Sequence, residues 1–176
     1  MANIWFGSDF HFGHKRIAEF RSEFISSEEE NRNKILEDCC KHVTKRDILY
    51  VLGDAAFTMD TVGDFDKIPG KKILVRGNHD LLDTQVYLKH FDAVYGIFKY
   101  KEFWLSHAPI HPQELRGKVN LHGHVHYDSV RLPFNPVTDV KQILDTRYLN
   151  LCCENLWLTF GRSIVSLDEI RQHLKQ

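Results

Sequence analysis

The most informative stretch of this chain is Ile73-Leu74-Val75-Arg76-Gly77-Asn78-His79-Asp80. Its first three residues are apolar and two of them are β-branched, which predicts a short buried strand. Gly77 ends that strand, and an amide, an imidazole and a carboxylate follow in succession. Polar side chains at the carboxyl end of a strand lie where open α/β sheets place their binding sites. Gly-Asn is also common turn chemistry, so this stretch alone does not distinguish a site from a solvated turn.

Length and composition predict a globular chain with one hydrophobic core. The chain has 176 residues, of which 43% are hydrophobic, and this suits one domain covering residues 1–176. The 23 Lys and Arg residues nearly balance the 24 Asp and Glu residues, so the overall charge indicates neither nucleic acid nor a membrane surface as a partner. Eleven His residues are a high count, and His is the commonest metal ligand.

The four cysteines form two vicinal pairs, Cys39-Cys40 and Cys152-Cys153, each in an apolar stretch. Vicinal cysteines are poor disulfide partners for each other, so we expect reduced core residues. The first residues lack the basic and apolar regions of a signal peptide, and no stretch approaches membrane-spanning length. These features predict a cytoplasmic protein.

The pattern of an apolar strand followed by a polar loop recurs along the chain. Besides residues 72–75, the predicted strands that run into polar loops are 3–7, 47–52, 103–105 and 119–121. Their loops carry Asp9 and His11, Asp54, His107, and His124 and His126. If the backbone stays extended from Asp9 to His11, both side chains point the same way and supply half of a metal site.

Helices are expected between the strands and near the end of the chain. Ser26-Ser27-Glu28 predicts the start of a helix that runs to about Val43, and Ser166-Leu167-Asp168-Glu169 predicts the start of the last helix. The remaining predictions are helices at 14–20, 59–68 and 81–91, strands at 93–98, 149–153 and 163–165, and a long surface loop at 127–146. Helices alternate with strands early and strands dominate late, which favours an α/β sandwich of two packed sheets.

Taken together, the motifs resemble the calcineurin-like metallophosphoesterase superfamily. The chain has, in the family's order, Asp-x-His, Gly-Asp, Gly-Asn-His-Asp, a His before Ala-Pro, and Gly-His-x-His. Asp9-Phe10-His11-Phe12-Gly13-His14 is similar to the small single-domain bacterial and phage phosphoesterases, whereas Gly53-Asp54-Ala55-Ala56-Phe57 departs from the protein phosphatase branch. The resemblance implies a four-layer α/β/β/α sandwich of two mixed sheets.

The resemblance also implies two divalent metal ions. Mixed nitrogen and oxygen ligands suit Mn, which we expect first, and also Fe, Zn or Ni. Two such ions clamp the attacking and leaving oxygens of a phosphoester, and a bridging hydroxide is the implied nucleophile. The implied ligands are Asp9, His11 and His126 for the first ion, Asn78, His107 and His124 for the second, and Asp54 as the bridge.

Four further residues are candidates for catalysis or substrate binding. The resemblance gives His79 no metal, so its imidazole is the candidate general acid, with Asp80 placed to orient the ring. His14 and Arg16 follow the first motif at the start of a predicted helix, where a substrate phosphate could bind. A solvated basic turn explains these two residues equally well.

The favoured function is a two-metal phosphodiesterase. One alternative is a phosphomonoesterase or nucleotide pyrophosphohydrolase that uses the same site. The alternative from another class is a non-catalytic metal-binding scaffold, which the seven filled ligand positions disfavour. The expected partner is a phosphoester substrate, with nucleotides among the candidates. The sequence leaves the oligomeric state open.

Overall fold

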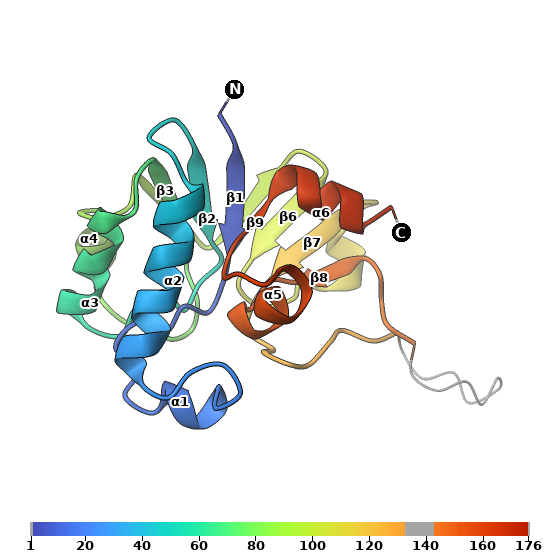
Figure 1. The fold of residues 1–176 in the computed structure, drawn as a ribbon. Coiled ribbons are helices and arrows are strands. Elements are labelled where there is room, and N and C mark those ends of the chain that lie inside the picture. Colours follow the sequence, from blue (N-terminus) through green and yellow to red (C-terminus); the bar gives the residue numbers. More distant parts are fainter. Residues whose placement is uncertain (1, 133–142, 176) are drawn as a thin grey trace.

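The chain forms two mixed β-sheets with helices packed around them (Figure 1). The computed structural model describes residues 2–132 and 143–175. The strands of the first sheet are β1 (Ile4–Gly7), β2 (Ile48–Val51), β3 (Lys71–Val75), β4 (Ala93–Tyr95) and β9 (Val165–Ser166). Those of the second are β5 (Ile97–Tyr100), β6 (Phe103–Ser106), β7 (Val119–His122) and β8 (Tyr148–Asn150). The predicted α/β fold of two sheets is confirmed.

Both sheets are mostly parallel with one antiparallel edge. The first has the order β4-β3-β2-β1-β9, in which β1 to β4 run parallel and β9 runs antiparallel to β1. The second has the order β5-β6-β7-β8, in which β5 alone is antiparallel. The parallel strands of each sheet therefore end at a common edge, where their loops gather.

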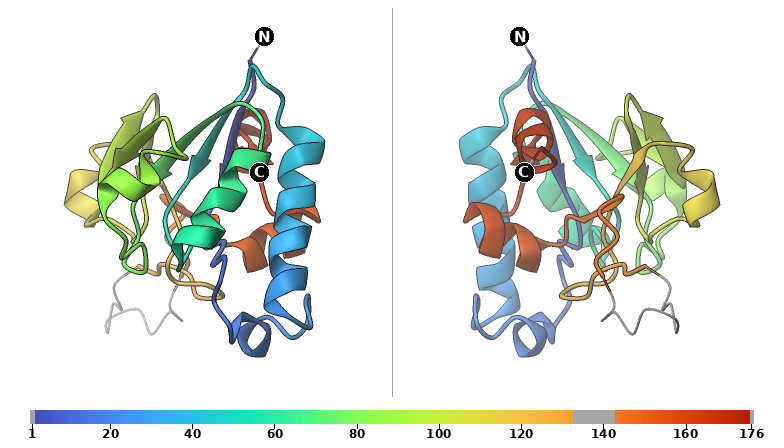
Figure 2. Two further views of the ribbon diagram at one scale, coloured as in Figure 1. Left: turned by 90° about the vertical axis from the view of Figure 1, so that its left-hand side faces the viewer. Right: turned by 90° about the vertical axis from the view of Figure 1, so that its right-hand side faces the viewer.

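Helices pack on the outer side of the first sheet and at its end. The elements on the outer side are α2 (Glu28–His42), α3 (Met59–Gly63), the 3₁₀ turn η1 (Asp64–Lys67) and α4 (Thr84–Tyr87), and α1 (Ile17–Phe20) lies beyond the end of the sheet, next to α2 (Figure 1). Later in the chain come the 3₁₀ turn η2 (Pro112–Glu114), α5 (Cys153–Phe160) and α6 (Leu167–His173). Figure 2 shows α2 on one side of the first sheet and the second sheet on the other.

Two helix starts follow the predicted capping chemistry. The Ser27 hydroxyl accepts a hydrogen bond from the Glu30 N–H, so α2 begins after Ser27 as expected. A reciprocal pair of bonds between Ser166 and Glu169 starts α6.

Alternate residues of the first sheet enter two different cores. On β1, Trp5 packs beneath the helices and Phe6 packs between the sheets. On β2, Leu49 likewise packs beneath the helices and Tyr50 packs between the sheets. Because both faces are buried, β1 and β2 are apolar along their length, and the loops that follow them are held by a rigid sheet.

Several predicted elements are shorter than expected or divided. The predicted helix 81–91 shrinks to α4, because the Arg76 guanidinium binds the carbonyl oxygens of Asp80 and Leu82 and holds that segment as a loop. The predicted helix 59–68 divides into α3 and η1, and that at 14–20 is reduced to α1. The predicted strand 93–98 divides at Gly96 into β4 of the first sheet and β5 of the second.

The predicted strand 149–153 is wrong in its second half. β8 ends at Asn150, and α5 begins at Cys153. A short apolar run is compatible with a buried strand or a buried helix, and here the helix packs Leu156 and Trp157 into the two cores. The predicted strand 163–165 shifts to Val165–Ser166.

The predicted loop at 127–146 is described only at its two ends. Residues 127–132 and 143–146 contain one isolated bridge, between Arg131 and Leu144, and the rest lies outside the described residues. No helix in the described ranges is long and apolar enough to cross a bilayer.

All four cysteines are free, as predicted, but only three of them are core residues. Cys39, Cys152 and Cys153 are buried, whereas Cys40 is exposed, because the outer side of α2 faces solvent.

Candidate metal centre

The predicted ligand residues come together where five loops leave β1, β2, β3, β6 and β7. The Asp9 N–H donates to the Gly53 carbonyl at 3.0 Å, which joins the first two loops. The Gly123 N–H donates to the His107 carbonyl at 2.8 Å, which joins the loops after β6 and β7. The two sheets thus contribute to one polar cluster.

The first ligand group surrounds Asp9, and in it Asp9 and His11 are buried whereas His126 is partly exposed. The His11 Nε2 atom lies 3.6 Å from Asp9 Oδ1 and 3.9 Å from Asp54 Oδ2. The His126 Nε2 atom lies 4.0 Å from Asp9 Oδ1. Asp9, His11 and Asp54 present ligand atoms within 4.8 Å of one another, so these residues could hold a metal ion.

The second ligand group lies on the other side of Asp54 and is more open to solvent. The Asp54 Oδ1 atom is 3.4 Å from His107 Nε2. Asn78 Oδ1 lies 2.9 Å from both His107 Nε2 and His124 Nδ1. The two carboxylate oxygens of Asp54 therefore face different groups, which is the geometry that a bridging ligand requires.

Two ring orientations suit metal binding. His107 donates from Nδ1 to the Leu52 carbonyl at 2.9 Å, and His126 donates from Nδ1 to Glu154 at 3.1 Å. Each ring is thereby held so that Nε2 faces the cluster. A metal-ligating His commonly uses its other nitrogen in this way.

Unpartnered buried atoms provide a separate test of whether a cation fits. Asp9 Oδ1 and both ring nitrogens of His11 are buried and have no hydrogen-bond partner among the described residues. Leaving a buried polar atom unpaired costs roughly 1–3 kcal/mol, so such atoms require an explanation. A divalent cation at Asp9 and His11 would supply it, and the nitrogen and oxygen donors suit Mn, Fe, Zn or Ni.

The backbone between the ligands is not extended, contrary to the expectation for Asp9 and His11. Both residues have positive φ, 57° and 53°, and so does Asp54, at 51°. His124 and His126 repeat the pattern at 73° and 51°. Non-glycine residues in this region are uncommon and concentrate at functional sites, where surrounding contacts hold the strain.

The electrostatics favour ionised carboxylates. Burial raises the pKa of Asp9, but interactions with His11, His107 and Ser8 outweigh burial and hold that pKa well below its usual range. Burial likewise raises the pKa of Asp54, and His107 reverses the effect, so the net shift is downward. Burial lowers the pKa of His11, which keeps its imidazole neutral and able to bind a cation.

The motif glycines leave room for the carboxylates. A Cβ atom on Gly123 would lie 2.1 Å from Asp9 Oδ2, and one on Gly77 would lie 2.3 Å from Asp54 Oδ1. Real Cβ atoms do not approach other atoms so closely, so only glycine fits at either position. The glycines of Gly-Asn-His-Asp and Gly-His-x-His are thus needed for close packing against the ligands.

His79 stands beside the cluster on the loop after β3. Its N–H donates to Asp54 Oδ1 at 2.9 Å, and its ring stacks on Phe57 with the centroids 5.4 Å apart. The expected role of Asp80 is wrong. Its oxygens accept bonds from the N–H groups of Asp54, Ala55 and Gly77, so Asp80 holds the loops together rather than orienting the His79 ring.

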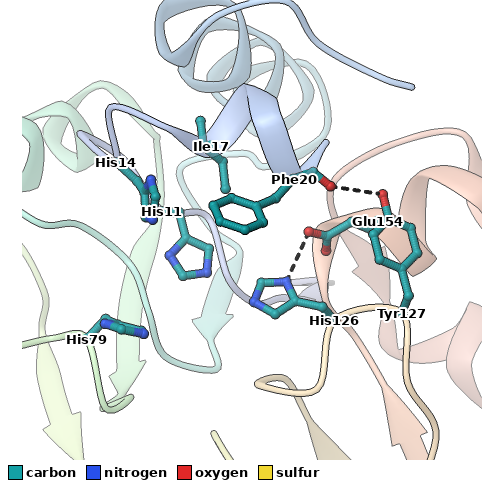
Figure 3. A pocket seen from close by; sticks show the side chains of 8 residues that line it. All are labelled: His11, His14, Ile17, Phe20, His79, His126, Tyr127 and Glu154. Carbon is teal, nitrogen blue, oxygen red and sulfur yellow. Dashed lines mark hydrogen bonds and ion pairs between the residues drawn. The ribbon is translucent and has the colours of Figure 1, made fainter. Parts of the chain in front are cut away.

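His14 and Arg16 separate in the structure. His14 packs edge-on against His11 and lines a cavity of about 440 Å³ next to the first ligand group. The Arg16 guanidinium instead forms an exposed ion pair with Glu19 at 2.6 Å and does not line that cavity. Figure 3 shows the cavity, with His11, His14 and His79 on one side, Tyr127 on the other, and Phe20 and His126 between them.

Three buried residues around Asp9 and His126 were not anticipated from the sequence. Glu154 on α5 binds both His126 and the Arg21 guanidinium, and Arg21 in turn donates to the Asp9 carbonyl. The Cys152 thiol donates to Asp9 Oδ2 at 3.2 Å and forms a further possible ligand group with Asp9 and His126. A lone Glu in the apolar stretch 149–158 was the available sign of a buried charge.

Comparisons with known proteins agree with this fold. No family model matches the chain. The Gene 66 protein of Mycobacterium phage D29 is 26% identical over 207 residues, covering 98% of this chain and 96% of the phage protein.

Two solved structures cover nearly the whole chain. A protein of unknown function from Aquifex aeolicus has a TM-score of 0.71 and 27% identity, and covers 98% of this chain and 100% of that one. A structure described as a novel archaeal phosphodiesterase has a TM-score of 0.50 and 16% identity, covering 95% of this chain and 94% of that one. These similarities establish the two-sheet fold.

Proposed function

We propose that this chain is a two-metal phosphodiesterase. The observation that carries the proposal is the convergence of the seven predicted ligand side chains around Asp54, with buried atoms of Asp9 and His11 left unpartnered. A fold shared with an archaeal phosphodiesterase supports the proposal, as does the resemblance of the motifs to calcineurin-like metallophosphoesterases.

In this proposal Asp9, His11 and His126 would hold the first ion, Asn78, His107 and His124 would hold the second, and Asp54 would be shared between them. Bound divalent ions would neutralise the phosphate charge and lower the pKa of a water molecule so that it can attack phosphorus. The Leu52 carbonyl orients the His107 ring, and Glu154 orients the His126 ring.

His79 is proposed to protonate the departing oxygen. Its ring lines the cavity beside the first ligand group and lies 6.0 Å from the His11 ring, centroid to centroid. Stacking on Phe57 fixes the ring plane without consuming a ring nitrogen. A positioned imidazole of this kind typically contributes about 100- to 10,000-fold to the rate as a general acid.

The cavities flanking the cluster favour a diester over a monoester. One cavity of about 440 Å³ touches His11, His79 and His126, and another of the same volume touches Asn78, His107 and His124. A phosphodiester has a substituent on each side of phosphorus, whereas a monoester has one. Cavities on both sides of the ligands therefore match the two substituents of a diester.

The experiment compares bis(4-nitrophenyl) phosphate with 4-nitrophenyl phosphate after exhaustive chelation and after addition of Mn²⁺. We expect no hydrolysis without metal, restored hydrolysis with Mn²⁺, and a higher kcat/KM for the diester. A higher kcat/KM for the monoester would favour a phosphomonoesterase. Absence of turnover with Mn²⁺, Fe²⁺, Zn²⁺ and Ni²⁺, despite metal binding, would instead indicate a scaffold.

The compartment and partners are part of the same proposal. Four free cysteines suit the reducing cytoplasm. The proposed partner is a small phosphoester.

A further inference from the structure

The cavity beside the first ligand group, which we call the aromatic pocket, has two chemically different kinds of lining. The imidazoles of His11, His79 and His126 line one part of it, and the rings of Phe20 and Tyr127 lie beside His126 in the other part (Figure 3). Phe20 is 58% exposed and Tyr127 is 48% exposed, so neither ring is placed by core packing. Exposed large aromatic side chains at the mouth of a cavity are typical of a ligand-binding surface.

Contacts already hold the two outer rings in position. The Phe20 ring packs edge-on against His14, with the centroids 5.9 Å apart and the planes at 87°. The Tyr127 hydroxyl donates to the Phe20 carbonyl at 3.5 Å, which links the loop after β7 to α1. Rings that are held before binding lose little conformational entropy when a ligand stacks on them.

The charged groups around the aromatic pocket favour an anion at the metal ligands and not against the aromatic rings. Among the described residues, the lining contains neither Lys nor Arg, and the carboxylate of Glu154 in its wall is already paired with Arg21 and His126. No cationic side chain of the lining is therefore available to hold an anionic group against Phe20 and Tyr127. A substrate phosphate belongs at the metal-ligand end, and a neutral planar group belongs against the rings.

We infer that the aromatic pocket receives the nucleobase of a nucleotide phosphoester, stacked against Phe20 and Tyr127. The inference rests on the proposed function, because it requires the phosphate to lie at the metal ligands. The volume of about 440 Å³ falls within the roughly 300–1,000 Å³ of small-molecule sites. Every base has a flat π face, so these rings would accept different bases.

The test measures the contribution of the base to binding by comparing two probes that share a sugar phosphate and differ in the base. Binding of adenosine 5′-monophosphate and of ribose 5-phosphate to the Mn²⁺-loaded protein is measured by calorimetry. We expect the adenosine compound to bind at least fivefold more tightly, which corresponds to about 1 kcal/mol, the lower end of base–aromatic stacking.

Matched variants test whether Phe20 and Tyr127 cause this difference in affinity between the two probes. Phe20→Ala and Tyr127→Ala should reduce the affinity ratio towards one, while Phe20→Tyr and Tyr127→Phe keep a ring and should preserve it. Leu158→Ala removes an apolar side chain that is 64% exposed and lies outside the pocket lining, so it should leave the ratio unchanged. Because Phe20 and Tyr127 are exposed, none of these changes removes core packing.

The outcomes distinguish this inference from the proposed function. A wild-type ratio near one, or a ratio that survives both alanine changes, overturns the nucleobase assignment while Mn²⁺-dependent hydrolysis of bis(4-nitrophenyl) phosphate still supports the phosphodiesterase. Failure of both probes to bind, despite that hydrolysis, also overturns the assignment. Absence of hydrolysis with any metal removes the proposed function itself.

Discussion

At the scale of single residues, Asp54 connects the two ligand groups. Its Oδ2 atom faces His11 at 3.9 Å and its Oδ1 atom faces His107 at 3.4 Å. A neutral amide cannot bridge two cations as a carboxylate does, so Asp54→Asn should lower the metal content of both sites together. Metal analysis after dialysis against Mn²⁺ measures this loss.

Single-site variants provide the comparison for Asp54→Asn. His126→Ala should mainly weaken the first site and His107→Ala the second, so each should retain close to one equivalent of metal. Two full equivalents of metal in Asp54→Asn would contradict the bridging assignment.

The loss of activity on replacing His79 should depend on the leaving group of the substrate. We expect His79→Asn to keep both metals, because its side chain belongs to neither ligand group. Hydrolysis of nitrophenyl diesters should fall modestly, since nitrophenolate leaves without protonation. Hydrolysis of alkyl or nucleoside diesters should fall by about 100-fold or more. Steady-state kinetics on both ester types measure the difference.

Two results would change the role given to His79. An equal loss on both types of ester would leave only stabilisation of charge on the phosphoryl oxygens. Loss of bound metal in His79→Asn would show that the residue is a ligand or a structural support.

At the scale of elements, the loop after β7 depends on Gly123. A Cβ atom there would lie 2.0 Å from Ser8 Oγ and 2.1 Å from Asp9 Oδ2, so Gly123→Ala must displace the loop or the carboxylate. We expect weaker binding at the first site, measured as at least a tenfold increase in the Kd for Mn²⁺. Gly96→Ala is the control, because its Cβ would meet no atom within 4 Å. Equal Mn²⁺ affinity in the two variants would refute this explanation of the glycine.

Helix α5 contributes to the site through the buried Glu154. Its carboxylate accepts bonds from Arg21 Nε at 2.7 Å and His126 Nδ1 at 3.1 Å. Glu154→Gln removes the charge opposite a fully buried guanidinium, which should lower the free energy of unfolding by about 3 kcal/mol. Urea denaturation of the metal-free protein measures this loss.

An exposed ion pair is the control for Glu154→Gln. Glu19→Gln breaks the exposed pair with Arg16 and should leave stability unchanged. If Glu154→Gln were as stable as Glu19→Gln, the buried pair would have no structural importance.

At the scale of the whole molecule, pH should change two quantities in opposite directions. These are the stability of the metal-free protein and the increase in stability that a bound metal causes. Burial lowers the pKa of His107, but Asp54 and Asp9 outweigh burial and raise it from 6.5 to about 9. A raised His pKa stabilises the metal-free protein fully below pH 6.5, and this contribution disappears as the pH rises to about 9. The hydrogen bond that His126 donates to Glu154 raises the pKa of His126 in the same direction.

We therefore expect the metal-free protein to lose stability on the order of 3 kcal/mol between pH 6.5 and pH 9. The increase in stability caused by Mn²⁺ should grow over the same range, because a metal binds the neutral imidazole. Denaturation with chelator and with Mn²⁺ at both pH values measures both trends. A metal-free protein that is equally stable at both would contradict the pairing of His107 with Asp54.

The sequence alone determined the central strands of the first sheet and two of the helix starts. Apolar runs around Phe6, Tyr50 and Leu74 predicted strands because their residues must fill cores on both faces of a sheet. Ser27 and Ser166 predicted helix starts because capping is local. The polar motifs also implied the ligand residues, through their resemblance to the calcineurin-like metallophosphoesterases.

Only the tertiary structure decided which groups touch. Arg21 and Glu154 are 133 positions apart, and their contact joins α5 to the residue that follows α1. The same holds for Asp80, which binds backbone groups of a neighbouring loop instead of His79, and for Phe20 and Tyr127, which meet at the mouth of the aromatic pocket. Local sequence encodes periodicity and capping, whereas such contacts depend on how distant segments pack together.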